Sequence, residues 1–276
     1  MSTGILLQRI LDTPLAIIDF ETTGFNARSD RVVEVAVVRV DPGEQPRLVL
    51  DTLVNPGRRV TATEIHRISD RDVQRAPRFG DIAGELLAVT SGCVIGAFNV
   101  YFDIKFLTAE MSRVGVEHSP PHLCVRYLRP MLQLGSDCRL NEACACHQVS
   151  YVNAHMASSD AMAAARLFIV YREEIVRRGI STYAELGRIR AYKFCQSFSS
   201  MPYPEPIVFS LPRCREVRSR TGIRTRTASS TLVTGQEPRL PVRTNARQVG
   251  LALNSVWKAL VAAAEDAKAK FEKWSR

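Results

Sequence analysis

The sequence predicts an α/β domain in which a mixed β-sheet is flanked by helices. Short apolar runs bounded by turn residues alternate with longer segments in which apolar residues recur at helical spacing. Their order is strand, strand, strand, helix, strand, helix, with the first strand expected at the centre of the sheet. Hydrophobic residues make up 46% of the chain and charged residues 24%, which is typical of a globular protein.

Four segments are predicted as strands. Residues 15–20 form an apolar run suited to a strand that is buried on both faces. Residues 31–40 and 47–54 are rich in Val and Leu and are separated by a Pro-Gly turn, which predicts an antiparallel hairpin added to the first strand. Residues 94–98 form another short buried strand.

Three segments are predicted as helices from their apolar spacing and their end signals. Residues 79–90 are followed by a glycine that ends the helix. Residues 99–114 begin with an asparagine as candidate N-cap and are also followed by a glycine. The last helix begins near Ser158 or Ser159 and continues to Arg178, with alanines and aromatic residues facing inward.

The composition changes after this domain, which we expect to span residues 1–180. Residues 181–245 read as a basic linker rich in Pro, Ser, Thr and Arg, and residues 246–276 as an amphipathic helix. Residues 179–276 carry 17 Lys and Arg against 7 Asp and Glu, a balance of +10, whereas residues 1–178 balance at −1. The asymmetry favours a polyanionic partner, although a solvated basic tail has the same composition.

Two carboxylates stand at the end of the first predicted strand. Because side chains alternate along a strand, Asp19 and Glu21 project to the same face and repel each other unless a divalent cation lies between them. The tight turn that follows could hold a phosphate or a sugar hydroxyl through its backbone N–H groups and hydroxyls. Its residues are Thr22, Thr23 and Gly24.

Two later segments add two carboxylates and a histidine. Asp103 falls in the first turn of the second predicted helix, and His155 and Asp160 fall at the start of the third. Taken singly, a first-turn acid only favours a helix N-terminus, and a loop histidine needs no function. Together with Asp19 and Glu21 they form a set at element ends, where sites are assembled from several segments. Two-metal cleavage of a phosphodiester needs this inventory.

These motifs resemble those of the DEDDh exonucleases. The pattern is Asp-x-Glu-Thr-Thr-Gly, then Asn-x-x-Phe-Asp, then His-x-x-x-x-Asp, and it covers about residues 14–175. The resemblance implies a ribonuclease H-like fold with a five-stranded mixed sheet and stepwise release of nucleoside 5′-monophosphates from a 3′ end. It also implies two divalent cations, Mg²⁺ or Mn²⁺. By the same resemblance the metal ligands are Asp19, Glu21, Asp103 and Asp160, and the general base is His155.

Further candidates for substrate binding come from the same motifs. Asn99 and Phe102 belong to the second motif, and His66 lies in the segment 64–69, which matches a family loop near the terminal nucleotide. The chain departs from many relatives at Phe98, where they have a histidine, and it matches only loosely over residues 120–152.

Several alternatives remain open at this stage. The cluster Cys138, Cys144, Cys146 and His147 could suggest zinc, but a second ligand pair is missing and buried helix cysteines are the simpler interpretation. The basic linker and the last helix could make the protein mainly a polymerase-associated adaptor or a proofreading-type subunit. An endonuclease of the ribonuclease H type also uses clustered carboxylates.

The leading hypothesis is a metal-dependent 3′→5′ exonuclease that acts on nucleic acid with a free 3′ end, with DNA favoured over RNA. No motif fixes contacts to the 2′ position, so the substrate preference rests on the resemblance alone. A protein partner could bind through the C-terminal helix. The odd number of cysteines and the absence of a long apolar run lead us to expect reduced thiols, a cytoplasmic location and no membrane span.

Overall fold

The computed structural model describes residues 5–199. The predicted helix 246–276 and all of the predicted linker beyond residue 199 lie outside the described residues.

Within the described residues, five strands form one mixed sheet in the order β3-β2-β1-β4-β5. The strands are β1 (Leu15–Thr22), β2 (Val32–Val40), β3 (Arg47–Leu53), β4 (Val94–Ala97) and β5 (His122–Cys124). β1 pairs antiparallel with β2 and parallel with β4, and β2 and β3 form the predicted antiparallel hairpin. The central position of β1 and the mixed sheet are therefore confirmed.

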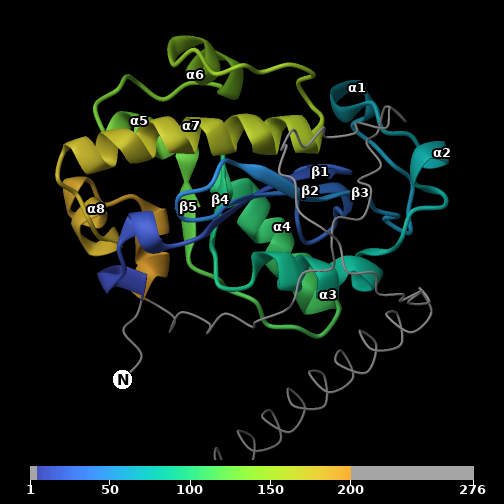
Figure 1. The fold of residues 1–276 in the computed structure, drawn as a ribbon. Coiled ribbons are helices and arrows are strands. Elements are labelled where there is room, and N and C mark those ends of the chain that lie inside the picture. The colour runs from blue at the N-terminus through green and yellow to red at the C-terminus, as the bar shows by residue number, and fades with distance from the viewer. Residues whose placement is uncertain (1–4, 200–276) are drawn as a thin grey trace, which may run out of the picture. The chain divides into compact units, whose positions relative to one another are not determined.

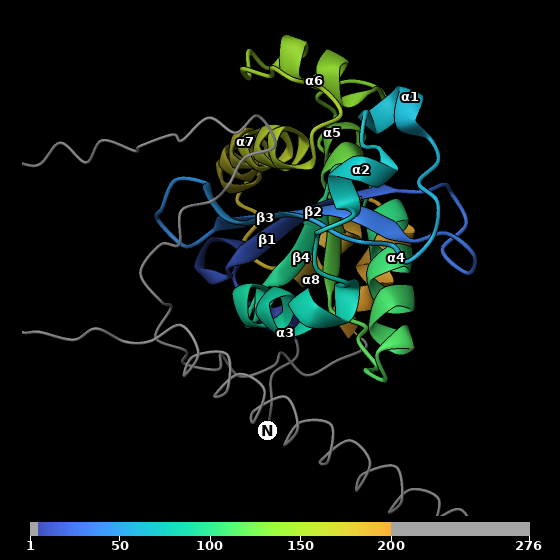
Figure 2. The same cartoon turned by 90° about the vertical axis from the view of Figure 1, so that its right-hand side faces the viewer.

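Helices cover both faces of this sheet (Figure 1). The long α7 (Ala157–Arg177) crosses one face and packs on β1 and β2. The view in Figure 2 shows α3 (Phe79–Thr90) and α4 (Val100–Arg113) on the opposite face. The remaining helices are α1 (Thr63–His66), α2 (Asp70–Val73), α5 (Val125–Met131), α6 (Leu140–Cys146) and α8 (Tyr183–Ile189). Short 3₁₀ helices are η1 (Ile5–Leu7), η2 (Ile10–Asp12) and η3 (Lys193–Ser199).

Coverage of both faces explains why the first half of β1, residues 15–18, and most of β2 are apolar. In β2 only Arg39 is more than marginally exposed, and Val33, Val35 and Val37 are fully buried. Burial of each such Val or Ile side chain stabilises the folded state by about 1.5–3 kcal/mol. Glu34 breaks the pattern, because it is a charged residue that is only 2% exposed. Its position in a core strand calls for a polar partner.

The compact part of the chain continues past residue 180. Tyr183, Phe194 and Phe198 are buried, and η3 packs against β5. The hydroxyl of Tyr101 in α4 accepts a hydrogen bond from the backbone N–H of Phe194 at 3.0 Å. Residues 183–199 therefore complete the hydrophobic core of this part of the protein. Among the described helices, none combines the length and the apolarity needed to cross a membrane.

Candidate active site

The first two carboxylates lie on the central strand. Asp19 and Glu21 stand two residues apart on β1, so both face α7, and both are half-buried. Across the antiparallel pairing Glu21 lies opposite Glu34 of β2. Three acidic side chains therefore share one face of the sheet, close to the N-terminus of α7.

Asp103 joins these carboxylates from α4, which lies on the opposite face of the sheet from α7. It lies in the first turn of α4, where it is 4% exposed, and its Oδ1 accepts a hydrogen bond from the backbone N–H of Phe20 at 3.1 Å. The bond orients the Asp103 carboxylate against β1 at Phe20, the residue between Asp19 and Glu21. The predicted placement of Asp103 in the first turn of a helix is confirmed, and its side chain also bonds to the backbone of β1.

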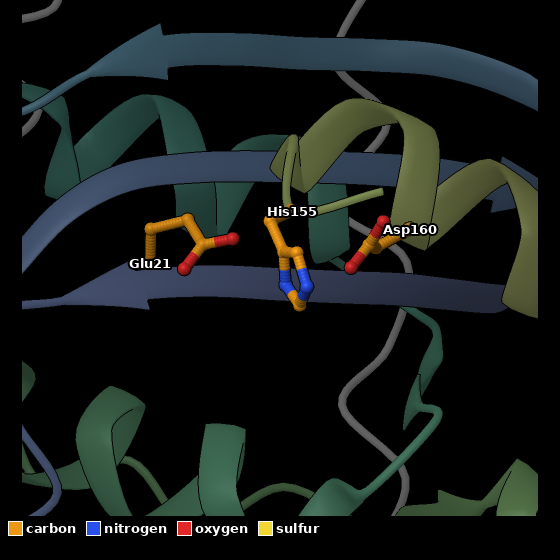
Figure 3. A group of neighbouring side chains, drawn as sticks. All are labelled: Glu21, His155 and Asp160. Carbon is orange, nitrogen blue, oxygen red and sulfur yellow. The ribbon is translucent and has the colours of Figure 1, made fainter. Parts of the chain in front are cut away.

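The third segment brings a histidine and a fourth aspartate. His155 is exposed in the loop before α7, and Asp160 is half-buried in the first turn of that helix. Figure 3 shows the imidazole of His155 between the carboxylates of Glu21 and Asp160. One ligand atom of each of these three residues lies within 4.8 Å of the other two. Asp19 and Asp103 do not belong to this close triplet.

Burial and mutual repulsion raise the pKa values of the aspartates. The pKa of Asp19 is raised well above its ordinary value by burial and by the neighbouring charges of Asp103, Asp160, Glu21 and Glu34. Burial raises the pKa of Asp103 to about 8, against the lowering effect of the Phe20 N–H. Burial also raises the pKa of Asp160, although Tyr151 and His155 lower it. The fold therefore concentrates negative charge that a cation would relieve.

The turn after β1 uses its own hydroxyls. The hydroxyl of Thr22 donates to the carbonyl of Gly24 at 2.6 Å, and that of Thr23 accepts from the N–H of Arg31 at 3.1 Å. A Cβ at Gly24 would lie 2.5 Å from Oδ2 of Asp30, so a larger residue there would require the Asp30 side chain to shift. The two hydroxyls thus build the turn; a contact of its backbone with a substrate remains a prediction.

His66 is likewise engaged inside its own loop. It is 1% exposed; Nδ1 accepts from the N–H of Ile68 at 3.0 Å, and Nε2 lies 3.0 Å from the carbonyl of Thr61. The hydroxyl of Thr61 donates to the carbonyl of Thr23, which ties this loop to the turn after β1. His66 therefore holds the loop in place, and Ile65, 39% exposed, is its apolar side chain open to solvent.

An aromatic group surrounds Phe102, the residue before Asp103 in the sequence. Phe102 is half-buried, its ring centroid 6.3 Å from that of Phe25 and 5.0 Å from that of Phe106. The ammonium of Lys105 lies 4.9 Å from the centroid of the Phe102 ring. Asn99 occupies the N-cap position of α4 without a side-chain cap bond. Phe25, 72% exposed, was not among the sequence candidates; a large aromatic directly after the Thr-Thr-Gly turn was the available signal.

The cysteines do not form a metal site in the described residues. Cys144 is buried in α6, Cys146 is exposed, and no three of Cys138, Cys144, Cys146 and His147 bring ligand atoms together. The expectation of buried helix cysteines therefore holds for Cys144 alone, because Cys146 is exposed and Cys138 is half-buried and precedes α6.

This arrangement defines a class of α/β proteins that carry a cluster of carboxylates and a histidine at the end of the central strand. The chain belongs to the RNase_T exonuclease family, whose match extends over residues 16–168 and includes Asp19, Glu21, Asp103, His155 and Asp160.

Two curated relatives illustrate this membership. The chain is 29% identical over 197 residues to a DNA polymerase III subunit epsilon-like protein of Rhodobacter capsulatus, covering 66% of this chain and 28% of that protein. It is 24% identical over 180 residues to the 3'-5' exonuclease DinG of Staphylococcus aureus, covering 62% of this chain and 19% of that protein. The matched region thus spans less than a third of either relative.

Solved structures share the fold. Exonuclease I of E. coli in complex with a dT13 oligonucleotide aligns with a TM-score of 0.50 and 18% identity, over 60% of this chain and 42% of that one. The nuclease domain of 3'hExo, a DEDDh family member bound to rAMP, aligns with a TM-score of 0.50 and 16% identity, over 63% of this chain and 96% of that one. The ribonuclease H-like sheet expected from the sequence is confirmed by this likeness.

Proposed function

We propose that the protein is a metal-dependent 3′→5′ exonuclease that hydrolyses the last phosphodiester bond of a nucleic acid and releases a nucleoside 5′-monophosphate. The observation that carries the proposal is the convergence of β1, α4 and the start of α7 on one cluster of four carboxylates and a histidine. The family membership and the name of the DinG relative support it.

The donor set fits hard divalent cations. Carboxylate oxygens are the ligands that Mg²⁺ and Mn²⁺ prefer, and the raised pKa values of Asp19 and Asp103 indicate carboxylates that a positive charge would stabilise. Two such cations would be bound by Asp19, Glu21, Asp103 and Asp160. A bound divalent cation supplies Lewis-acid stabilisation of the negative charge that develops on the phosphate.

His155 is assigned as general base. A neutral imidazole can take the proton of the attacking water while the water oxygen forms its bond to phosphorus and the bond to the leaving 3′ oxygen breaks. The leaving 3′ oxygen takes a proton from solvent. The exposed position of His155 between Glu21 and Asp160 supports this role, since the ring is open to water and lies beside two of the proposed metal ligands.

The substrate end is assigned to the apolar groups beside the cluster. Phe25 and Phe102 offer an aromatic face on which a base can stack, and Ile65 is exposed on the loop that the Thr61–Thr23 bond ties to the turn after β1. Asn99 and the backbone of Thr22, Thr23 and Gly24 remain candidates for polar contacts, and His66 acts by holding its loop.

We favour DNA as the substrate, because the curated relatives include a DNA polymerase III subunit epsilon-like protein and a DNA polymerase III PolC-type protein. A 3′-end degradation assay that compares single- and double-stranded DNA and RNA of one sequence tests this assignment. Faster release of nucleotides from DNA supports DNA as the substrate, and faster release from RNA would make RNA the substrate instead. A function in DNA replication or repair, a cytoplasmic location and a protein partner for residues 246–276 belong to the same proposal.

A further inference from the structure

Glu34 is a buried carboxylate outside the five candidate catalytic residues. It lies on β2 directly opposite Glu21, with 2% of its surface exposed. Its Oε2 accepts a hydrogen bond from the backbone N–H of Ala157 at 3.2 Å. Ala157 is the first residue of α7, so this bond joins the sheet to the N-terminus of the helix that carries Asp160.

The bond answers a specific need of the helix. The first N–H groups of a helix have no partner within it, and a carboxylate there also favours the positive end of the helix dipole. Met156, at the N-cap, makes no side-chain cap bond. Glu34 supplies the missing acceptor across the sheet, although its charge lies near Asp19 and raises the pKa of that residue. An apolar residue at position 34 would fill the same space without repelling Asp19.

The loop that Glu34 adjoins is strained. His155 has a φ of 65° and Asn153 a φ of 56°, and both values lie in the left-handed region that non-glycine residues adopt only at an energetic cost. Such a conformation persists only where the surroundings determine it. Ser159 contributes by donating from its hydroxyl to the carbonyl of Val152, and so closes the loop on the first turn of α7.

Tyr151 holds the other side of the same segment. Its hydroxyl donates to Oδ1 of Asp160 at 2.8 Å, and the side chain is half-buried. The hydrogen bond occupies one lone pair of Oδ1 and fixes the orientation of the Asp160 carboxylate. The loop from Tyr151 to Asp160 is thus anchored at Ala157 by Glu34 and at Asp160 by Tyr151.

We propose that Glu34 and Tyr151 are positioning residues, which hold the His155 loop and the first turn of α7 in register with the end of β1. The inference rests on the proposed function, since it assigns what keeps His155 and Asp160 opposite Glu21. Neither residue touches the reacting atoms; each acts through the residue it bonds.

The hydrogen bond of Glu34 is tested in the metal-free full chain by amide exchange. Glu34→Ala should speed exchange of the Ala157 N–H by roughly 10–100-fold, as expected for loss of a bond to a charged acceptor. Glu34→Gln keeps an amide oxygen that can accept the same N–H, and should restore most of the protection. Unchanged exchange at Ala157 in both variants would overturn the role of Glu34 whether or not the protein is a nuclease.

Activity then tests what the bond does. Glu34→Ala should lower kcat by about 10–100-fold and leave KM within about threefold, and Glu34→Gln should recover most of the loss. Equal loss in Glu34→Ala and Glu34→Gln, or a change in KM alone, would contradict positioning of the reacting groups. If Glu34→Ala does not fold, the comparison of Glu34→Gln with wild type for Ala157 exchange and the Tyr151 pair below still decide.

A second tyrosine serves as a control for Tyr151, which lies in the loop before α7. Tyr171 in α7 is fully buried, and its hydroxyl makes no hydrogen bond within residues 5–199. Tyr151→Phe should lower kcat by about tenfold with little change in thermal stability, whereas Tyr171→Phe should leave kcat unchanged. Equal activities in the two variants would overturn the role of Tyr151. A wild-type protein that cleaves no nucleic acid would instead remove the proposed function, while the exchange result at Ala157 would still stand.

Discussion

Asp103 in α4 accepts a hydrogen bond from the backbone N–H of Phe20 in β1, two segments that lie 83 residues apart in the chain. The bond draws a buried carboxylate from one layer of the fold to the end of the central strand. It also lowers the pKa of Asp103, yet burial outweighs it and raises that pKa to about 8. The fold therefore keeps this carboxyl group protonated at pH values where an isolated carboxyl group is ionised.

The first prediction concerns pH. The folded protein keeps the proton of Asp103 up to about pH 8, whereas an unfolded chain loses it near pH 4. The metal-free protein should therefore lose stability as the pH rises from about 4 to about 8. Thermal unfolding in EDTA measures this, and Mg²⁺ should oppose the loss because it binds the deprotonated carboxylates.

Asp103→Asn serves as the control, since an amide does not titrate. It should flatten the fall in melting temperature of the EDTA-treated protein over the same pH range. A wild-type melting temperature that climbs steadily from pH 5 to pH 8 in EDTA would contradict the raised pKa.

The second prediction concerns Asp19. Asp19→Asn removes the charge on which Asp103, Asp160, Glu21 and Glu34 all act. Hydrolysis and Mn²⁺ binding should both be lost, while the metal-free variant gains about 1 kcal/mol or more in its free energy of unfolding. Calorimetric Mn²⁺ titration and thermal unfolding measure the two effects. Asp12→Asn, at an exposed position, should change neither; an Asp19→Asn variant that binds Mn²⁺ as wild type does would refute the assignment.

The third prediction separates two roles of His155. As general base it contributes about 10²–10⁴-fold to the rate, so His155→Ala should lose that factor at saturating Mg²⁺ and keep its affinity for Mn²⁺. Its ring lies close enough to Glu21 and Asp160 to serve as a ligand as well. A parallel drop in Mn²⁺ affinity would make His155 a ligand, and full activity would remove it from the mechanism.

The fourth prediction concerns the stability of the scaffold. Glu110 in α4 is 1% exposed. Its carboxylate accepts hydrogen bonds from Nε and Nη2 of Arg31 at 2.8 and 2.9 Å, and from the backbone N–H of Val32 at 3.3 Å. Glu110→Ala should cost about 2–4 kcal/mol of unfolding free energy, because it strands these donors. The exposed Arg9–Asp12 pair is the comparison, and Asp12→Ala should cost under about 1 kcal/mol by urea unfolding. Equal costs would show that the Glu110 contacts add nothing.

The sequence predicts the parts of the fold whose signal is local. The helix over Phe79–Thr90 was expected with these bounds, and β1 to β4 differ from expectation by one or two residues at their ends. The strand β5 has three residues and passes directly into α5, so neither develops a period that a sequence reveals. The helices α1 and α2 are each a single turn for the same reason.

For the site, the sequence places each residue at the end of an element but cannot measure burial. Thr22, Thr23 and His66 look like substrate contacts because they belong to the motifs, and yet their side chains bond within their own loops. Glu34 looks like one acid in an apolar strand, and only the register of β1 with β2 puts it opposite Glu21. Long-range register and burial carry the information that local patterns lack.

The most direct test of the account follows the polarity of degradation. A DNA strand labelled at its 5′ end and incubated with the full chain and Mg²⁺ should give a ladder that shortens one nucleotide at a time, with free nucleoside 5′-monophosphates, and EDTA should stop it. A circular single strand of the same sequence should stay intact. Cleavage of the circle, or loss of the label as the first product, would contradict a 3′→5′ exonuclease.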